Sequence, residues 1–197
     1  MSKPIKILLV LFFIFLIVFA NNSSASQDPG PEKVQQAITN QIKLIERWGK
    51  DPAIIKSIIS QNEKKVTLSE IQAIDKTWMA ATGISDFMKD LMNNPSSQRL
   101  KHLARSPIYS EVFVMDDQGA LVALTKKTSD YWQGDEAKWQ KAFNEGKGGT
   151  FVDKPQYDKS TDAILIQVSL PIKNNGGTAI GTITVGLNLD RLKTTIK

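Results

Sequence analysis

Hydrophobic residues follow a helical period in the first half of the chain. They recur every three to four positions over residues 31–48, which predicts an amphipathic helix there. Pro31 suits the first turn of this helix, because a proline at that position loses no intrahelical hydrogen bond. Residues 49–52 interrupt the pattern, and a second helical segment is expected over residues 53–60. Residues 31–60 are therefore predicted to be mainly helical.

A capping box, Thr67-Leu-Ser-Glu70, marks the start of a further helix. The spacing predicts one long helix that ends at Asn93-Asn-Pro95, with Trp78 in the core. One more short helix is expected over residues 96–104. The apolar face of the long helix is expected to consist of Ile71, Ile74, Trp78, Ala81, Ile84, Phe87 or Met88, and Leu91.

The second half of the chain alternates between apolar and polar positions, as half-buried strands do. Asp116-Asp-Gln-Gly119 and Asn174-Asn-Gly-Gly177 are typical of hairpin turns, with glycines that adopt positive φ. Asp190 is expected to cap a short C-terminal helix. The predicted strands cover residues 111–116, 120–125, 150–152, 163–172 and 178–187.

A loop and a helix, residues 128–143, separate the second predicted strand from the third. Asp135 is expected to cap this helix, with Glu136 in the first turn, and Trp139 and Phe143 share one helix face. Since hairpins make neighbouring strands antiparallel, the element order predicts an α+β fold. It consists of long N-terminal helices followed by a five-stranded antiparallel sheet with an inserted loop-helix.

Composition excludes several classes of site. The chain has no Cys, so disulfides, thiolate metal sites and cysteine nucleophiles are excluded. His102 is the single His, which argues against multi-His metal sites and nucleophile–His relays. The net charge of +5 is spread along the chain without a basic block, so no nucleic-acid partner is expected. We expect no metal and no cofactor.

The N-terminus combines Lys3 and Lys6 with an apolar run over residues 7–20. This run is shorter than the roughly 20 residues that span a bilayer, and it suits a secretory signal. We therefore expect a signal peptide over residues 1–25, a linker over 26–30 and one domain over 31–197, located in the periplasm or otherwise outside the cytoplasm. The alternative is an uncleaved N-terminal anchor in the inner membrane.

Four segments in this order resemble the extracellular sensor domains called Cache or PDC, which have a PAS-like fold. They are Glu111–Gly119, Thr128–Trp139, Val168-Ser-Leu-Pro-Ile172 and Ile180–Gly186. The resemblance implies a long N-terminal helix, a five-stranded antiparallel sheet, and a pocket between the sheet and the loop-helix for a small carboxylate or amino acid. In this family the sensor usually lies between two membrane helices, ahead of a signalling module. This chain has no second apolar segment or output module, so we expect a single-domain form that signals through a membrane or periplasmic partner.

The pocket is expected between two polar strand residues and the loop. In the alternative interpretation, the loop aromatics cover the core, Asp130 and Asp135 cap backbone groups, and the strand face is solvated. The expected ligand-binding residues are Phe113, Asp130, Tyr131, Trp132, Gln133, Asp135, Gln167 and Ser169.

Two further functions compete with ligand sensing. A hydrolase could use Asp135 and Glu136 as paired carboxylates, but adjacent helical residues point about 100° apart, so we expect no enzyme. A structural or adaptor protein of the cell envelope would need no ligand. The apolar stripe over residues 34–48 extends beyond what a small sheet can cover, so a weak homodimer through this helix is also expected.

Overall fold

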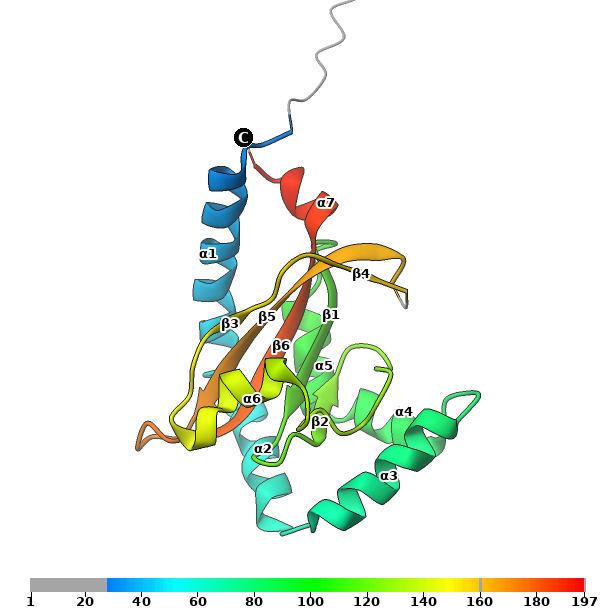
Figure 1. The fold of residues 1–197 in the computed structure, drawn as a ribbon. Coiled ribbons are helices and arrows are strands. Elements are labelled where there is room, and N and C mark those ends of the chain that lie inside the picture. Colours follow the sequence, from blue (N-terminus) through cyan, green and yellow to red (C-terminus); the bar gives the residue numbers. More distant parts are fainter. Residues whose placement is uncertain (1–27, 160, 197) are drawn as a thin grey trace, which may run out of the picture.

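The computed structural model describes residues 28–159 and 161–196 (Figure 1). The predicted signal peptide, residues 1–25, lies outside the described residues. Residues 28–30 of the predicted linker have no regular structure and lead directly into the first helix.

Five α-helices form the first half of the described chain. Pro31 opens α1 and the Thr67–Glu70 capping box opens α3, as the sequence predicts. Pro52 and Pro95, which were expected to interrupt or end helices, open α2 and α5 instead. The helices are α1 (Pro31–Trp48), α2 (Pro52–Glu63), α3 (Leu68–Ala80), α4 (Asp86–Asn93) and α5 (Pro95–Leu103).

The single long helix predicted after the capping box is two helices. α3 ends at Ala80, and the side chain of Ser85 caps α4 by accepting a hydrogen bond from the Met88 amide. Gly83 lies between them, where its low helix propensity favours a break. As a result, Ile84 is 43% exposed instead of buried. Of the two alternatives Phe87 and Met88, Met88 is buried at 1% exposed, whereas Phe87 is 45% exposed. Trp78 is only 2% exposed, which confirms its predicted place in the core.

The strands form one antiparallel sheet in the order β2-β1-β6-β5-β3, and β4 pairs with another part of β5. The predicted α+β class with an antiparallel sheet is confirmed. β4 adds a short sixth strand that the alternation does not indicate. The strands are β1 (Tyr109–Met115), β2 (Leu121–Leu124), β3 (Phe151–Val152), β4 (Gln156–Asp158), β5 (Ala163–Lys173) and β6 (Ala179–Asn188).

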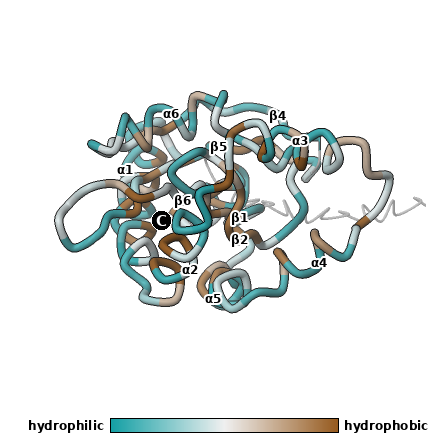
Figure 2. Tube along the Cα trace, turned by 90° about the horizontal axis from the view of Figure 1, so that it is seen from below, coloured by the Kyte–Doolittle hydropathy of each residue, from teal (hydrophilic) through white to brown (hydrophobic). Residues whose placement is uncertain are grey.

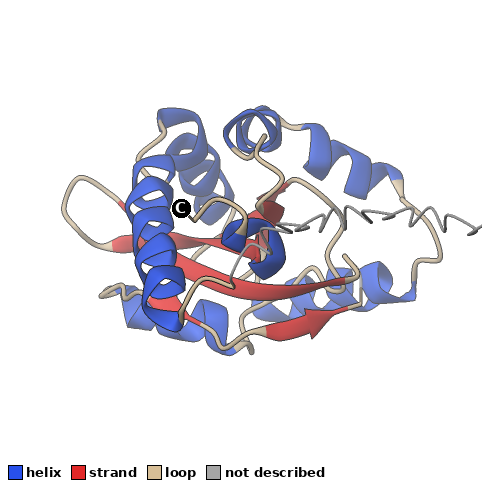
Figure 3. Ribbon diagram, turned by 90° about the horizontal axis from the view of Figure 1, so that it is seen from above, coloured by secondary structure: helices blue, strands red, loops and turns tan. Residues whose placement is uncertain are grey.

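Helices cover both faces of the sheet. α6 (Ala137–Phe143) and the 3₁₀ turn η1 (Asn144–Gly146) lie over one face, in front of β5 and β6 in Figure 1. α2 and α5 lie on the opposite side, as Figure 2 shows in a view from below. The hydrophobic segments gather between these layers in Figure 2, and Figure 3 shows the strands as one layer with helices on either side.

The large hydrophobic core lies on the face away from α6. Ile38, Ile45 and Trp48 of α1 are buried in it, and Val34 and Ile42 pack half-buried against it. The apolar stripe of α1 is therefore used inside the domain and does not extend beyond its cover, contrary to the premise of the expected homodimer. The sheet is long enough to cover the stripe because β5 and β6 reach 11 and 10 residues.

The two ends of the described chain lie side by side (Figure 1). α7 (Leu189–Lys193) follows β6 directly, and the Lys193 ammonium lies 2.9 Å from a carboxylate oxygen of Asp28, just before α1. Asn188, rather than the predicted Asp190, caps α7 by accepting a hydrogen bond from the Arg191 amide. Asp190 instead lies inside the first turn, two residues after the cap.

Candidate ligand-binding site

The face of the sheet that lies under α6 carries polar side chains in rows across three central strands. Glu111 of β1 pairs with Gly186 of β6, which pairs with Gln167 of β5. In the next row, Phe113 pairs with Thr184, which pairs with Ser169. The first row stays partly open, whereas the second is sealed: Thr184 and Ser169 are fully buried and share a hydrogen bond of 2.8 Å.

A cavity of about 450 Å³ lies over the open row. β1 and β5 supply its floor, and the segment after β2, the first turn of α6 and the end of β4 supply its walls. Five charged side chains and five uncharged ones line it: Glu111, Lys127, Lys138, Asp158 and Lys159, and Phe113, Thr128, Ser129, Gln133 and Gln167.

The wall segment over residues 127–133 is fixed by hydrogen bonds from below. The carboxylate of Asp75 on α3 accepts hydrogen bonds from the amides of Tyr131 and Trp132 at 2.7 and 3.0 Å. The Trp132 indole donates to the carbonyl of Gln118 in the β1–β2 turn at 2.8 Å. The cavity wall is therefore anchored to both α3 and the sheet.

Gln133 is the most deeply buried polar residue of this wall, at 1% exposed. Its Nε2 donates to the carbonyl oxygen and the carboxylate of Asp130, at 3.1 and 2.6 Å. Its Oε1 is buried and has no donor among the described residues. A buried acceptor without a donor costs free energy of about 1–3 kcal/mol. Such a group in a cavity wall therefore favours binding of a ligand or a water that donates a hydrogen bond to it.

Lys138 contributes a buried cation to the cavity, although its position in the sequence indicates a solvated side chain. The side chain is 11% exposed, and its ammonium lies 2.7 Å from a carboxylate oxygen of Glu136. The same ammonium lies 5.5 Å from the centre of the Phe113 ring. This cation–π contact and the ion pair hold Lys138 against the floor.

Glu111 contributes a half-buried carboxylate to the floor. Gln167 Nε2 donates to Glu111 Oε1 at 3.0 Å. Burial raises the pKa of Glu111 above its ordinary value, and the hydrogen bond from Gln167 and the charge of Lys138 offset only part of this effect.

The predicted site residues divide into two groups. The structure brings Phe113, Gln133 and Gln167 together around the cavity, and Asp130 holds Gln133 from behind. Asp130 also accepts a hydrogen bond from the neighbouring Ser129 hydroxyl at 2.6 Å, so its carboxylate is used within the loop.

The other four predicted residues lie away from the cavity. Tyr131 is 3% exposed and packs between Trp78 and Phe87, with ring centres 5.8 and 5.6 Å away, because the chain turns its ring toward α3 and α4. Trp132 points to the β1–β2 turn, and Ser169 is sealed beneath α6. Asp135 is exposed and does not cap α6, because the helix begins at Ala137, one residue later than a cap at Asp135 requires.

Sequence reasoning missed all five charged residues of the cavity. Glu111 had a usable signal, because it alternates in phase with Phe113 and therefore lies on the same face of a central strand. Lys138 follows the cap region of α6 and resembles any exposed helical lysine. Asp158 and Lys159 end a strand that the alternation does not reveal.

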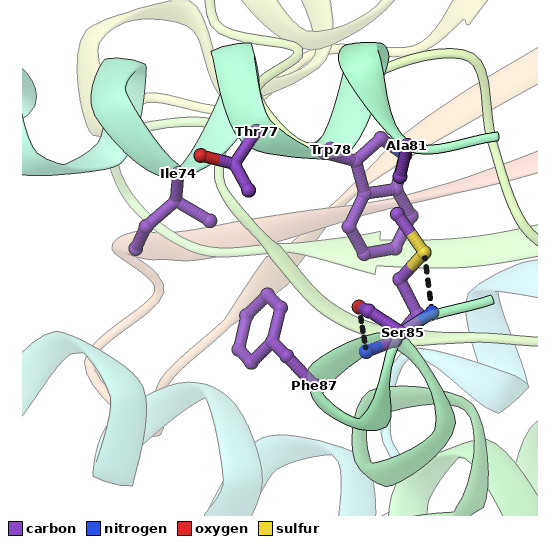
Figure 4. A pocket seen from close by; sticks show the side chains of 7 residues that line it. Ile74, Thr77, Trp78, Ala81, Ser85 and Phe87 are labelled. Carbon is purple, nitrogen blue, oxygen red and sulfur yellow. Dashed lines mark hydrogen bonds between the residues drawn. The ribbon is translucent and has the colours of Figure 1, made fainter. Parts of the chain in front are cut away.

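A second cavity, of about 270 Å³, lies between α3 and α4 (Figure 4). In Figure 4 the rings of Trp78 and Phe87 and the side chain of Ile74 point toward one space. Its lining is almost wholly apolar, and the Ser85 hydroxyl is already used to cap α4. This cavity lacks the polar groups that orient a small polar ligand.

Within residues 28–159 and 161–196, no group of three or more His, Asp or Glu residues could hold a metal ion. In the same part of the chain, no helix combines the length and apolar character needed to span a bilayer.

Similar structures come from bacterial receptors. No curated protein sequence matches the chain. The ligand-binding domain of the Pseudomonas aeruginosa PAO1 amino acid chemoreceptor PctC, in complex with GABA, is 12% identical, with a TM-score of 0.45 over 83% of this chain and 59% of that one. The sensory domain of the Campylobacter jejuni chemoreceptor Tlp3 with isoleucine bound is 18% identical, with a TM-score of 0.40 over 85% and 69%. The sensor domain of the V. cholerae histidine kinase DctB is 8% identical, with a TM-score of 0.41 over 82% and 54%. The chain thus spans little more than half the length of the PctC and DctB domains.

The family comparison is more direct. The model of the first PDC sensor domain of methyl-accepting chemotaxis protein-like receptors matches residues 59–194. This range holds the whole sheet, the wall segment and α6, and it is more than half of the chain. The chain therefore belongs to the family of first PDC sensor domains of methyl-accepting chemotaxis protein-like receptors.

Proposed function

We propose that this chain is a sensor domain that binds a small carboxylate-bearing molecule in the cavity between the sheet and the 127–133 segment. The observation that carries the proposal is the cavity itself, of about 450 Å³, with polar groups from four elements converging on one space. Ligand sites are typically cavities of about 300–1,000 Å³ with a few precisely placed polar groups.

Three lysines favour a ligand with a carboxylate. Lys127, Lys138 and Lys159 line the cavity, against the two carboxylates of Glu111 and Asp158. Lys138 is held in place before any ligand arrives, so little side-chain entropy is lost when it binds an anion. Hydrogen bonds between an ammonium and a carboxylate are among the strongest that side chains make.

The proposed role is sensing without catalysis. Glu136 is paired with Lys138, and Asp135 is exposed outside the cavity, so the two do not converge as an acid–base pair. The family to which the chain belongs is one of sensor domains. We propose that the domain works outside the cytoplasm, as the basic start and the apolar run over residues 7–20 indicate, and that it signals through a membrane or periplasmic partner.

A thermal-shift screen of the purified protein with amino acids and short carboxylates tests this proposal. A ligand should raise the melting temperature of the wild-type protein. Lys138→Met keeps most of the packing over Phe113 but removes the charge, so affinity should fall about 10- to 100-fold. Lys147→Ala is the control, because the Lys147 side chain, directly after η1, is 72% exposed and does not line the cavity. If no compound shifts the wild-type protein, or if Lys138→Met binds as tightly as the control, the proposed site is wrong.

A further inference from the structure

The second cavity, between α3 and α4, takes no part in the proposed carboxylate site. α3 ends at Ala80 and α4 begins at Asp86, and a space of about 270 Å³ lies between the two helices. Figure 4 shows the side chains of Ile74, Trp78 and Phe87 pointing toward this space. An apolar cavity of about 150 Å³ is enough to hold benzene, so this one has room for a molecule of two fused rings.

The polar side chains of the lining are already engaged within the protein. The Thr77 hydroxyl donates to the Ala73 carbonyl at 3.2 Å, and the Ser85 hydroxyl caps α4. The Trp78 indole donates to the Thr128 carbonyl at 3.0 Å. None of the described residues that line the cavity is charged. An uncharged, apolar molecule therefore gains most from entering, because it leaves water without giving up hydrogen bonds.

Two aromatic rings in the lining favour a flat aromatic molecule over an aliphatic one. Trp78 and Phe87 have ring centres 6.3 Å apart and planes inclined at 82°. Aromatic rings attract one another in stacked and edge-to-face arrangements, and two rings at this angle offer both kinds of contact to a third. The thioether of Met88 lines the same cavity, and sulfur–aromatic contacts are favourable as well.

One side of the cavity is fixed, whereas the other is accessible from solvent. Trp78 is buried, and its hydrogen bond to Thr128 holds the indole in place, so this ring loses little conformational entropy when a molecule packs against it. Phe87 is exposed, and residues 81–85, which connect the two helices, have no helical structure. A small molecule can therefore enter beside Phe87.

We infer that the cavity between α3 and α4 is a second binding site, which takes a small uncharged aromatic compound of one or two rings. Its ligand class differs from that of the cavity over the sheet, which is lined by five charged side chains. Binding between α3 and α4 needs no group of the proposed carboxylate site, so either site can exist without the other.

Indene and benzimidazole, measured by calorimetry on the wild-type protein, test this inference. The two compounds have the same fused-ring shape, but benzimidazole carries two polar ring nitrogens that would lose their hydrogen bonds to water in an apolar cavity. We expect indene to bind at least tenfold more tightly than benzimidazole. Absence of indene binding, or equal affinities for the two compounds, would overturn the inference and leave the proposed carboxylate site unaffected.

Two adjacent alanines locate the binding. Ala81→Leu adds a larger apolar side chain that fills part of the cavity, so it should reduce the affinity for indene at least tenfold without lowering the melting temperature of the protein alone. Ala80→Leu is the control, because Ala80 is exposed at the end of the same helix and does not line the cavity. Circular dichroism establishes that each variant is folded.

Phe87→Ala provides a second test that holds even where Ala81→Leu does not fold. It removes one of the two rings and should also weaken the binding of indene at least tenfold. Unchanged affinity for indene in either folded variant would overturn the inference. A wild-type dimer in sedimentation that Phe87→Ala dissociates, without indene binding, would assign the cavity to a second copy of the chain instead.

Discussion

At the scale of single residues, Asp116 carries the most strongly perturbed carboxylate that the structure describes. It is 2% exposed at the end of β1, and its Oδ1 accepts hydrogen bonds from the amides of Gln118 and Ala120, both at 2.9 Å. Burial raises its pKa from 3.8 to about 6, although these two hydrogen bonds act in the opposite direction. The turn role that the sequence predicts for Asp116 is confirmed, but its burial is not visible in the sequence.

Asp116→Asn should change how stability depends on pH. Because the pKa is higher in the folded state than in the unfolded state, the stabilising contribution is fully present below about pH 4 and is lost as pH rises through about 6. Each pH unit between the two pKa values is worth about 1.4 kcal/mol, so the loss is about 3 kcal/mol. Asparagine keeps the Oδ1 acceptor without the charge.

Denaturant unfolding between pH 4 and pH 8 checks this prediction. The variant should be more stable than the wild type at pH 8 and should show a flatter pH profile. Asp86→Asn is the control, since the Asp86 side chain on α4 is 94% exposed. A variant less stable than the wild type at pH 8 would show that the ionised carboxylate stabilises the turn.

Two turn glycines allow a matched comparison. Gly119 and Gly177 have φ of +86° and +83°, where an L-residue costs about 1–2 kcal/mol. A Cβ atom at Gly119 would lie 2.5 Å from the backbone of Gly134, whereas one at Gly177 would meet nothing within 4 Å. Gly177→Ala should therefore lower the free energy of unfolding by about 1–2 kcal/mol, and Gly119→Ala by clearly more. Equal losses in urea unfolding would mean that the turn moves away from Gly134 at no cost.

At the scale of elements, local signals in the sequence predicted most boundaries. Pro31 and the Thr67–Glu70 capping box mark helix starts, and glycine-containing turns mark hairpins, because these features act within a few residues of where they occur. The sequence did not predict the break between α3 and α4, because the apolar spacing continues through Gly83 as it would in a single helix. The weak helix propensity of Gly83 and the cap that Ser85 provides for α4 together separate the two helices. Tertiary contacts decide whether the chain breaks there.

The candidate site was predictable in part for the same reason. The position of Gln167 on the face of β5 that lies under α6 follows from strand alternation, which has a period of two. The direction of loop side chains has no such rule, so Tyr131 and Gln133, only two residues apart, end in a core and in a cavity wall. Lys138 and Asp158 reach the cavity through the packing of α6 and β4 on the sheet, which no local pattern encodes.

Removing the Trp78 ring from the hydrophobic cluster around α3 and α4 should strongly destabilise the fold. Trp78 packs against Tyr131 and Phe87, and its indole donates to the Thr128 carbonyl at 3.0 Å. Trp78→Ala should therefore lower the free energy of unfolding by about 3–5 kcal/mol, and Tyr131→Ala by a similar amount. Because the two rings touch, the losses in the double variant should deviate from additivity by about 0.5–3 kcal/mol.

Chemical denaturation of the two single variants and the double variant measures the losses in free energy of unfolding and their deviation from additivity. Phe87→Ala, at a ring that is 45% exposed, provides the comparison and should cost less than Trp78→Ala. A loss below about 1 kcal/mol for Trp78→Ala would contradict the buried position of this ring.

At the scale of the whole molecule, the cavity borders one hydrophobic cluster and lies across the sheet from the other. Phe113 forms part of its floor and also belongs to the cluster of Trp78, Met88 and Tyr131. The opposite face of the same strands packs on α1, whose start pairs with α7 through Asp28 and Lys193. A ligand in the cavity therefore contacts the sheet that joins both clusters, whereas the ends of the described part of the chain meet on the far side of that sheet.

Hydrogen exchange should show where a ligand acts on the whole domain. A compound present at about a hundred times its Kd adds roughly 2.7 kcal/mol to the stability of the folded state, which corresponds to about 5–10 °C in melting temperature for a domain of this size. Beyond this global effect, amides of residues 127–138 should gain the largest local protection, because the ligand would bridge that segment to the floor formed by β1 and β5. The cavity between α3 and α4 provides the internal comparison, since its lining is almost wholly apolar. Protection concentrated in α3 and α4, with residues 127–138 unchanged, would place the ligand in that second cavity and remove the assigned site.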